Sequence, residues 1–470
     1  MQLTLHPDRA LPAEPALRDI ARDIYRQTRA LPLVCMHGHI DAAVVAGNAA
    51  FDDPAGLLVT PDHYVTRQLV SAGISLADLG IAGAAQPATA DSREVWRTFC
   101  AHWHLFRGTP SRYWLEHQLV ELLGVDVRPS AETADAIYDR ICVRLAEPEF
   151  RPRALLDTFG IEVLATTDSA TSRLTEHALL RDEGFGGRVV PTFRPDGLVH
   201  IDRPHWADRV RDLAQLTGAD TQTYAGFLAA IRARRADFAA LGARATDHGH
   251  LRADCERLSP AAAERTYRQA LADDLAPGAA AAFAGHMLHE MALMSCADGL
   301  VMQLHVGVWR DHDSGIEAEY GSDRGFDIPI AAEFTRALQP ILRSVGRDPR
   351  FRLILFTVDE STYSRELAPL AGVYPSVRLG APWWFLDSPD GLRRFRELVT
   401  ETAGFYNTSG FVDDTRAFLS IPARHDLSRR VDAGYLARLV AEHRLDGDEA
   451  VETAIDLAYR IPRAAYAPST

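Results

Sequence analysis

Short apolar runs that end in polar residues recur along the chain, separated by intervals with the spacing of amphipathic helices. This alternation is typical of βα units, which place parallel strands side by side in one sheet. Eight runs fit the pattern: 31–37, 161–166, 188–193, 243–247, 299–305, 352–357, 377–380 and 410–414. The fourth has little strand propensity and is supported mainly by its position. Eight parallel strands that close on themselves form a barrel, so the predicted fold is α/β, a distorted (β/α)8 barrel.

Several intervals between these runs are too long for a single crossover helix. After the first run, residues 42–156 have an amphipathic pattern and predict a large helical insertion. Residues 195–243, 261–297 and 435–459 predict additional helices. Barrels with insertions reach beyond about 400 residues as one unit, so we expect a single domain over residues 1–470.

Charge and cysteine content argue against several classes of function. The chain has 64 acidic and 50 basic residues, a formal net charge of -14, which argues against a nucleic acid partner. The sequence contains no lysine, which excludes a Schiff-base lysine and a carbamylated lysine between two metals. Five scattered cysteines without a Cys-x-x-Cys pair favour the reducing cytoplasm. We find no export signal and no apolar stretch of membrane-spanning length, so we expect no membrane partner; a homo-oligomer is compatible with the sequence.

His37 and His39 stand at the end of the first run, separated by Gly38. Residues two apart in a strand point to the same face, so both imidazoles could reach one cation. Barrel active sites lie at the carboxyl ends of the strands, where the fourth and eighth runs end in Asp247 and Asp414. Two imidazoles and one carboxylate would form a three-ligand site with positions left for water or substrate. An isolated His-x-His pair can equally be structural, and that alternative stays open here.

A second His-x-His pair, His102 and His104, lies in a helix-like stretch. Residues two apart diverge by about 200° around a helix, so a shared metal is not expected there.

Two arginines at strand ends favour a substrate with an acidic group. Arg194 follows the third run and Arg416 follows the eighth. A guanidinium presents a rigid fork to a carboxylate. The alternative for each is a structural ion pair, of Arg194 with Asp196 and of Arg416 with Asp413.

Four further residues have open roles at this stage. His305 ends the fifth run and could be a metal ligand, an acid/base group or a core histidine. Trp383 follows the seventh run and could stack on a sugar ring or fill the core. His63 and Tyr64 lie in the predicted insertion, where spacing alone gives them a structural role.

Taken together, the motifs resemble those of the uronate isomerases, also called glucuronate isomerases, a branch of the amidohydrolase superfamily. The resemblance covers nearly the whole chain, and the motifs occur in the family's order. They are the His-x-His strand, Asp62-His63-Tyr64, Thr166-Thr167-Asp168, Arg194-Pro195-Asp196, Met302-Gln303-Leu304-His305, Trp383-Trp384-Phe385 and the Asp-Thr-Arg-Ala-Phe-Leu-Ser motif from Asp414 to Ser420. Asp-Thr-Arg replaces the commoner Asp-Ser-Arg, which is a mild change. With Asp359 rather than histidine after the sixth run, and no lysine, the two-metal hydrolase pattern is disfavoured.

The resemblance implies one divalent metal, with zinc as the expected ion, held by His37, His39 and Asp414. It implies interconversion of D-glucuronate with D-fructuronate, and of D-galacturonate with D-tagaturonate, by proton transfer between C2 and C1. Through it, Tyr64 joins Asp414 as an acid/base pair and His63 becomes an active-site candidate. The full set of candidates is Asp414, Tyr64 and His305 for catalysis, and His63, Arg194, Arg416 and Trp383 for binding of the hexuronate.

Two other functions remain alternatives. One is a hydrolase or decarboxylase on the same barrel, in which a single metal generates hydroxide. The other is a sugar-acid-binding protein without catalytic activity.

Overall fold

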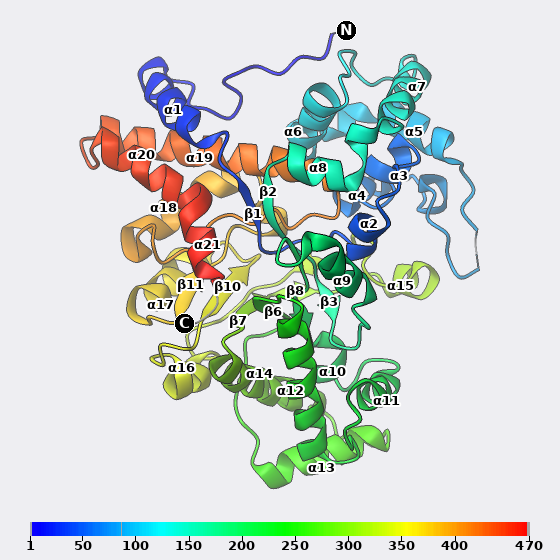
Figure 1. The fold of residues 1–470 in the computed structure, drawn as a ribbon, viewed down its shortest axis with the longest axis vertical. Helices are drawn as coiled ribbons and strands as arrows, with labels where there is room; N and C mark the ends of the chain where they lie inside the picture. The colour runs from blue at the N-terminus through cyan, green and yellow to red at the C-terminus, as the bar shows by residue number, and fades with distance from the viewer. Residues whose placement is uncertain (1, 86, 468–470) are drawn as a thin grey trace.

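Parallel strands form the centre of the molecule and helices surround them (Figure 1). The computed structural model describes residues 2–85 and 87–467. One sheet has the order β1-β2-β4 and another has the order β11-β10-β7-β6-β5-β3, with parallel pairing throughout both. The predicted α/β class is confirmed. The strands are β1 (Leu33–Cys35), β2 (Ile161–Ala165), β3 (Asp168–Ser169), β4 (Val189–Val190), β5 (Phe193–Arg194), β6 (Ala245–His250), β7 (Val301–Val306), β10 (Leu353–Thr357) and β11 (Val377–Leu379).

Backbone hydrogen bonds join the two sheets, because β2 and β3 run on from one another and so do β4 and β5. The Thr166 amide donates to the Val190 carbonyl at 3.0 Å, and the Asp168 amide donates to the Thr192 carbonyl at 3.0 Å. The ladder therefore passes without a break from the first sheet into the second.

The other junction lies between β11 and β1, where residues 410–414 were expected to form a strand. That prediction of a regular strand is wrong. The segment is bonded at its two ends, where the Ser409 amide donates to the Leu379 carbonyl at 2.8 Å and the Asp414 amide donates to the His37 carbonyl at 3.1 Å. Asp414 has φ 41°, a left-handed conformation that ends the extended geometry. The segment nevertheless occupies the eighth place and closes the order of the barrel.

Side chains of the strands alternate between the inside and the outside of this ring, as the period of two requires. Leu33 and Leu164 pack outward in one buried cluster, and Met302 and Leu353 pack outward in another. Their neighbours on the strands belong to a third cluster, which includes the barrel interior: Val34, Val163, Ala245, Val301 and Ile354. The fourth predicted run, weak by propensity, forms the first half of β6, so tertiary packing outweighs its low strand preference.

The elements described between β1 and β2 are helical. They pack in the same buried cluster as Leu33 and Cys35 of β1, a cluster that includes the fully buried Trp96. These elements are α2 (Ala42–Gly47), α3 (Pro54–Leu58), α4 (His63–Ser71), η1 (Ala77–Leu79), α5 (Ser92–Ala101), η2 (Trp103–Phe106), α6 (Pro110–His117), η3 (Gln118–Leu122), α7 (Ala134–Leu145), η4 (Pro148–Phe150) and α8 (Pro152–Thr158).

Helices also fill the other intervals and both ends of the described chain. Among the described residues, no helix combines the length and the apolar composition that a membrane span requires. They are α1 (Pro15–Thr28), α9 (Thr175–Leu180), η5 (Arg181–Phe185), α10 (Asp196–Val199), α11 (Trp206–Thr217), α12 (Tyr224–Ala240), α13 (Pro260–Leu271), α14 (Ala279–Asp298), α15 (Ser314–Tyr320), α16 (Gln339–Val345), η6 (Tyr363–Leu367), α17 (Ala368–Val373), η7 (Trp384–Leu386), α18 (Pro389–Ala403), η8 (Phe418–Ser420), α19 (Ile421–Ala441), α20 (Gly447–Ile455), η9 (Asp456–Arg460) and α21 (Ile461–Ala465). A short antiparallel pair, β8 (Val308–Trp309) and β9 (Ile328–Pro329), follows β7.

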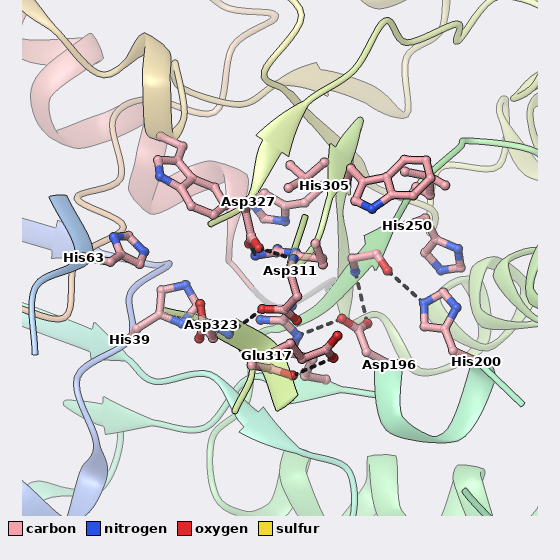
Figure 2. Close-up of a pocket in the computed structure, with 18 of the residues that line it drawn as sticks. His39, His63, Asp196, His200, His250, His305, Asp311, Glu317, Asp323 and Asp327 are labelled. Atoms are coloured by element: carbon pink, nitrogen blue, oxygen red, sulfur yellow. Dashed lines mark hydrogen bonds and ion pairs between the residues drawn. The ribbon is translucent and has the colours of Figure 1, made fainter. Parts of the chain in front are cut away.

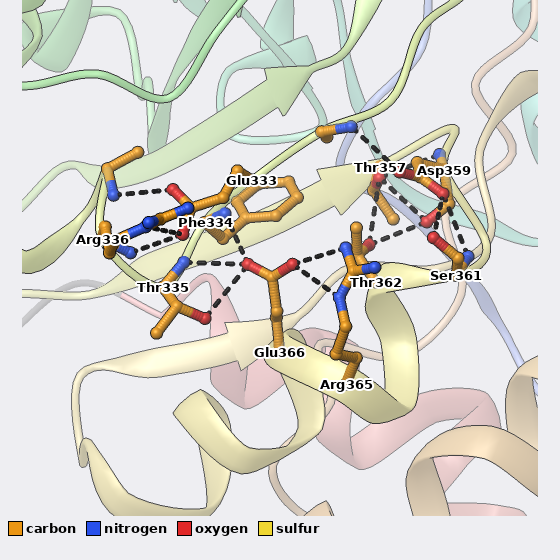
Figure 3. Close-up of polar contacts among 12 residues, drawn as sticks. Glu333, Phe334, Thr335, Arg336, Thr357, Asp359, Ser361, Thr362, Arg365 and Glu366 are labelled. Atoms are coloured by element: carbon orange, nitrogen blue, oxygen red, sulfur yellow. Dashed lines mark hydrogen bonds and ion pairs between the residues drawn. The ribbon is translucent and has the colours of Figure 1, made fainter.

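The chain after β9 is bonded to two carboxylates, that of Asp359, which accepts from the Ala332 amide at 2.9 Å, and the buried one of Glu366 in η6 (Figure 3). Its Oε2 accepts hydrogen bonds from the Phe334 amide at 2.7 Å, the Thr335 amide at 2.9 Å and the Thr335 hydroxyl at 3.0 Å. Its Oε1 accepts from Arg365. Because β9 pairs with the strand that follows β7, this carboxylate supports one wall of the site described below.

Replacing Glu366 with alanine is expected to lower the free energy of unfolding by about 2–3 kcal/mol, because two inward-facing amides lose an ionised acceptor. Denaturant unfolding measures this change. The control is Arg336→Ala, whose side chain is 89% exposed and whose loss should cost no more than about 0.5 kcal/mol. Equal losses in the two variants would contradict this role of Glu366.

Candidate active site

A cavity of about 760 Å³ opens at the carboxyl ends of the parallel strands. Figure 2 shows His39, His63 and His305 arranged around it, although they come from distant parts of the chain. One further predicted residue, His37, lies behind the lining in contact with Asp414. The predicted residues that line the cavity are His39, His63, Tyr64, Arg194, His305, Trp383, Asp414 and Arg416.

His37, His39 and Asp414 converge on one point. The Nε2 atoms of His37 and His39 lie 3.3 Å and 3.0 Å from the same oxygen, Oδ1 of Asp414. Backbone bonds hold the two segments together, since the His39 amide also donates to the Thr415 carbonyl at 3.0 Å. The left-handed turn at Asp414 lets its carboxylate reach both rings. Two imidazole nitrogens and a carboxylate oxygen within 4.8 Å of one another are a donor set that fits a divalent cation.

The charges in this group follow from burial and from one another. Burial by itself raises the pKa of Asp414, but His37 and His39 outweigh it and hold that pKa well below its ordinary value. Burial lowers the pKa of His39 despite the carboxylate. In His37, burial is outweighed by Asp414, and the pKa is raised. Asp414 is therefore ionised, and it offers a negative charge to a cation bound between the two rings, which must both be neutral to act as ligands.

His305 is held by a second buried carboxylate. Its Nδ1 donates to Oδ1 of Asp247 at 2.8 Å, because a carboxylate can only accept. Its Nε2 is buried without a hydrogen-bond partner among the described residues. The ring centroid lies 4.6 Å from that of His37. His305 therefore presents a free nitrogen close to the group of His37, His39 and Asp414, as either a ligand or an acid/base group would.

Arg194 is ion-paired twice within the cavity wall. Its Nε donates to Asp196 at 2.9 Å, and a terminal nitrogen lies 3.3 Å from Asp247. The structural ion pair with Asp196, the alternative weighed above, is thus present. Arg194 still lines the cavity, and its guanidinium contacts Asp247, the hydrogen-bond partner of His305.

Arg416 is paired with Asp323, not with Asp413 as the alternative had it. Asp323 lies between α15 and β9 and lines the same cavity. Asp413 instead faces His425, whose Nε2 lies 3.3 Å from Oδ2. The guanidinium of Arg416 therefore lies at the cavity in an ion pair with the Asp323 carboxylate. A carboxylate of a bound ligand could form the same kind of ion pair.

Aromatic rings form another wall. His63 stacks on Trp384 with centroids 5.2 Å apart and an interplanar angle of 10°. Trp383 meets His305 edge to face at 4.6 Å. Trp383 is 6% exposed, so most of its indole packs in the core while its edge reaches the cavity.

Tyr64 belongs to a buried network that we did not predict. Its hydroxyl donates to Oδ2 of Asp387 at 3.0 Å, and Arg424 donates to the same oxygen at 2.7 Å. Burial is the main reason that the pKa of Asp387 is raised to about 6, and burial also raises the pKa of Tyr64 well above its ordinary value. Arg424 lines the cavity as well, from α19.

Sequence reasoning missed Asp387 and Arg424 for different reasons. Asp387 comes two residues after Trp-Trp-Phe, a motif that we noted without extending it. Arg424 lies in a long helix with three buried arginines, Arg424, Arg429 and Arg430, and no local spacing shows which of their guanidinium groups reaches the cavity.

The comparisons with known proteins agree along nearly the whole chain. A family profile described as glucuronate isomerase matches residues 16–465. A uronate isomerase of Phenylobacterium zucineum is 52% identical over 464 residues, covering 99% of this chain and 97% of that protein. A uronate isomerase of Xanthomonas campestris pv. campestris is 52% identical over 465 residues, covering 99% of both chains.

Solved structures show the same likeness. The crystal structure of a glucuronate isomerase from Caulobacter crescentus has a TM-score of 0.97 and 48% identity, covering 99% of this chain and 97% of that one. A uronate isomerase from Thermotoga maritima has a TM-score of 0.92 and 26% identity, with 99% and 100% covered.

Proposed function

This chain belongs to the glucuronate isomerase family and is an isomerase, and we propose that it interconverts D-glucuronate with D-fructuronate and D-galacturonate with D-tagaturonate. The observation that carries the substrate assignment is the meeting of two chemistries in one cavity. His39 and Asp414 offer ligands for a cation, and Arg416 offers a guanidinium for a carboxylate. A sugar acid presents both a carboxylate and oxygens that a cation binds.

His37, His39 and Asp414 would hold the divalent cation, and zinc suits two imidazoles and a carboxylate. When bound, such an ion supplies a Lewis acid for a sugar oxygen. His305 lies beside this group and is a further candidate for a ligand or an acid/base residue. Its Nδ1 is bonded to Asp247, and its Nε2 has no hydrogen-bond partner among the described residues. The unpaired cysteines of the described chain are consistent with a reducing compartment, and we propose the cytoplasm.

Isomerisation requires that a proton leave C2 and that a proton arrive at C1. Asp414 is our candidate for moving the proton from C2 to C1, because its carboxylate is ionised and lines the cavity. A carboxylate oxygen bound to a cation is a poor base, so the second oxygen of Asp414 would face the sugar. Arg416 would bind the substrate carboxylate, and His63, Arg194 and Trp383 would surround the rest of the hexuronate.

The test is a coupled assay of both hexuronates with the protein as isolated, after chelation, and after zinc is restored. We expect turnover that chelation removes and zinc recovers. Conversion of neither hexuronate under zinc-replete conditions would overturn the proposal, and a product whose mass differs from that of the hexuronate by a gain of water or a loss of carbon dioxide would point to a hydrolase or decarboxylase instead.

Replacing Arg416 with methionine is expected to raise KM for hexuronates about 10- to 100-fold, the loss of a charged hydrogen bond worth about 1.5–3 kcal/mol. A neutral aldose tested at high concentration serves as the substrate control, since its KM should change little. The matched variant is Asp323→Asn, which removes the resident carboxylate from Arg416 and should leave KM unchanged or lower it. Equal effects of Arg416→Met on both sugars would rule out carboxylate recognition.

A further inference from the structure

Asp387 is a buried carboxylate at the edge of the site that the proposed mechanism does not use. It is 6% exposed and directly follows η7. Oδ2 accepts from Tyr64 and Arg424, whereas Oδ1 is buried with no hydrogen-bond partner among the described residues. A buried carboxylate oxygen without a donor is costly, so a carboxylate kept in this state calls for an explanation.

The side chain of Arg424 is held in place by contacts on several sides. Its Nε donates to the Ser420 hydroxyl at 2.8 Å, and its NH1 also donates to the Asp413 carbonyl at 3.3 Å. Its guanidinium lies 3.7 Å from the ring centroid of Trp114. The ion pair of Arg424 with Asp387 therefore holds the carboxylate rigidly behind the phenol of Tyr64.

The direction of the hydrogen bond decides what Tyr64 can do in the cavity. A phenol has one proton, and Tyr64 donates it to Asp387, away from the substrate. Only lone pairs of its oxygen are then left for a sugar hydroxyl. Tyr64 can take up a hydroxyl proton only if its own proton passes to Asp387 at the same time.

Aldose–ketose isomerisation needs such a step. Besides the proton that moves from C2 to C1, one proton must leave the hydroxyl at C2 and one must arrive at the oxygen of C1. We propose, on the basis of the isomerase function above, that Asp387 is the proton acceptor behind Tyr64: it takes the phenol proton when Tyr64 takes the proton of a sugar hydroxyl.

The transfer balances without any further reactant. The O–H bond of the sugar breaks as a new O–H bond forms on Tyr64, and the original phenol O–H bond breaks as one forms on Asp387. The reverse transfer returns a proton to the other sugar oxygen and restores the carboxylate. The raised pKa of Asp387 is consistent with its taking a proton; it reflects burial first, opposed by Arg424, Tyr64 and Arg67 and reinforced by Asp414.

Asp387→Asn tests this assignment, because the amide can still accept from Tyr64 but cannot hold the proton. We expect kcat to fall about 100-fold or more, the usual contribution of a positioned acid/base group, with KM and metal content little changed. The matched control is Asp390→Asn, three residues away and exposed, which should behave as the wild type. Unchanged kcat in Asp387→Asn would overturn the proposal.

Tyr64→Phe covers the case in which Asp387→Asn folds poorly, because it leaves the ion pair of Arg424 with Asp387 intact. It should cause the same loss, and the double variant should lose no more than the larger single loss, since both residues form one relay. Additive losses would contradict a relay. The isotope effect from substrate deuterated at C2 should also shrink in both variants as hydroxyl transfer becomes limiting; a purely structural defect would leave it unchanged.

These results separate the relay from the function on which it rests. If the wild-type protein with zinc converts neither hexuronate, the proposed function fails. If the wild type converts them and both variants do so equally well, only the role of Asp387 fails.

Discussion

Replacing Asp414 with asparagine is expected to lower kcat for hexuronates by about 10³- to 10⁴-fold under zinc-replete conditions, because the amide cannot accept the proton from C2. The substitution preserves the shape of the side chain, and an asparagine tolerates the left-handed backbone found at this position. Far-UV circular dichroism and thermal unfolding should therefore be close to those of the wild type. Proton NMR in deuterated water gives an independent readout, since exchange at C2 should stop.

Asp413→Asn is the matched control, because the neighbouring carboxylate faces His425 rather than the cavity. It should lower the free energy of unfolding by about 1–3 kcal/mol, through a buried polar contact, yet keep most of kcat. Metal content is measured in both variants, so loss of a ligand can be told from loss of a base. An Asp414→Asn variant with near-normal turnover would remove Asp414 from the mechanism.

The parts of the site that could be predicted are those governed by local rules. The period of two along a strand predicted His37 and His39 on one face, and the rule that strand ends gather at one edge predicted Asp414 beside them. The two histidines do converge on Asp414, although β1 ends at Cys35 and both lie in the segment that follows it. The structure places these three residues within 4.8 Å of one another. The α/β fold was likewise readable from the alternation of apolar runs and helical intervals.

What could not be predicted depends on packing between distant elements. Tyr64 reaches the cavity because α4 packs beside the cavity. We assigned His63 and Tyr64 to the site only through the resemblance to a family. The pairing of Tyr64 with Asp387, and of Asp387 with Arg424, joins positions up to 323 residues apart. The pairing of Arg416 with Asp323 spans 93 residues. No spacing along a single element predicts contacts of this kind. The turn at Asp414, which replaces a regular strand, could not be predicted either, because it depends on the contacts of this segment with His37 and His39.

Replacing His39 with alanine is expected to remove the bound metal and to lower turnover at least about 10³-fold, because a site with three protein ligands loses one of its two imidazoles. Inductively coupled plasma mass spectrometry after gel filtration gives the zinc per chain, and adding zinc should not restore activity at concentrations that saturate the wild type. The fold should persist, since the His39 ring is partly exposed and lies on the cavity side of the barrel.

The chain itself offers the control, in its second His-x-His pair. His102 and His104 have ring centroids 6.1 Å apart, and the Nδ1 of His102 is already bonded to the Thr98 carbonyl at 2.8 Å. No carboxylate in the described chain joins these two rings as Asp414 joins His37 and His39. His104→Ala should therefore keep the wild-type zinc content and turnover. If both alanine variants retained the metal, the ion would have to bind elsewhere, and the convergence of His37, His39 and Asp414 would need another explanation.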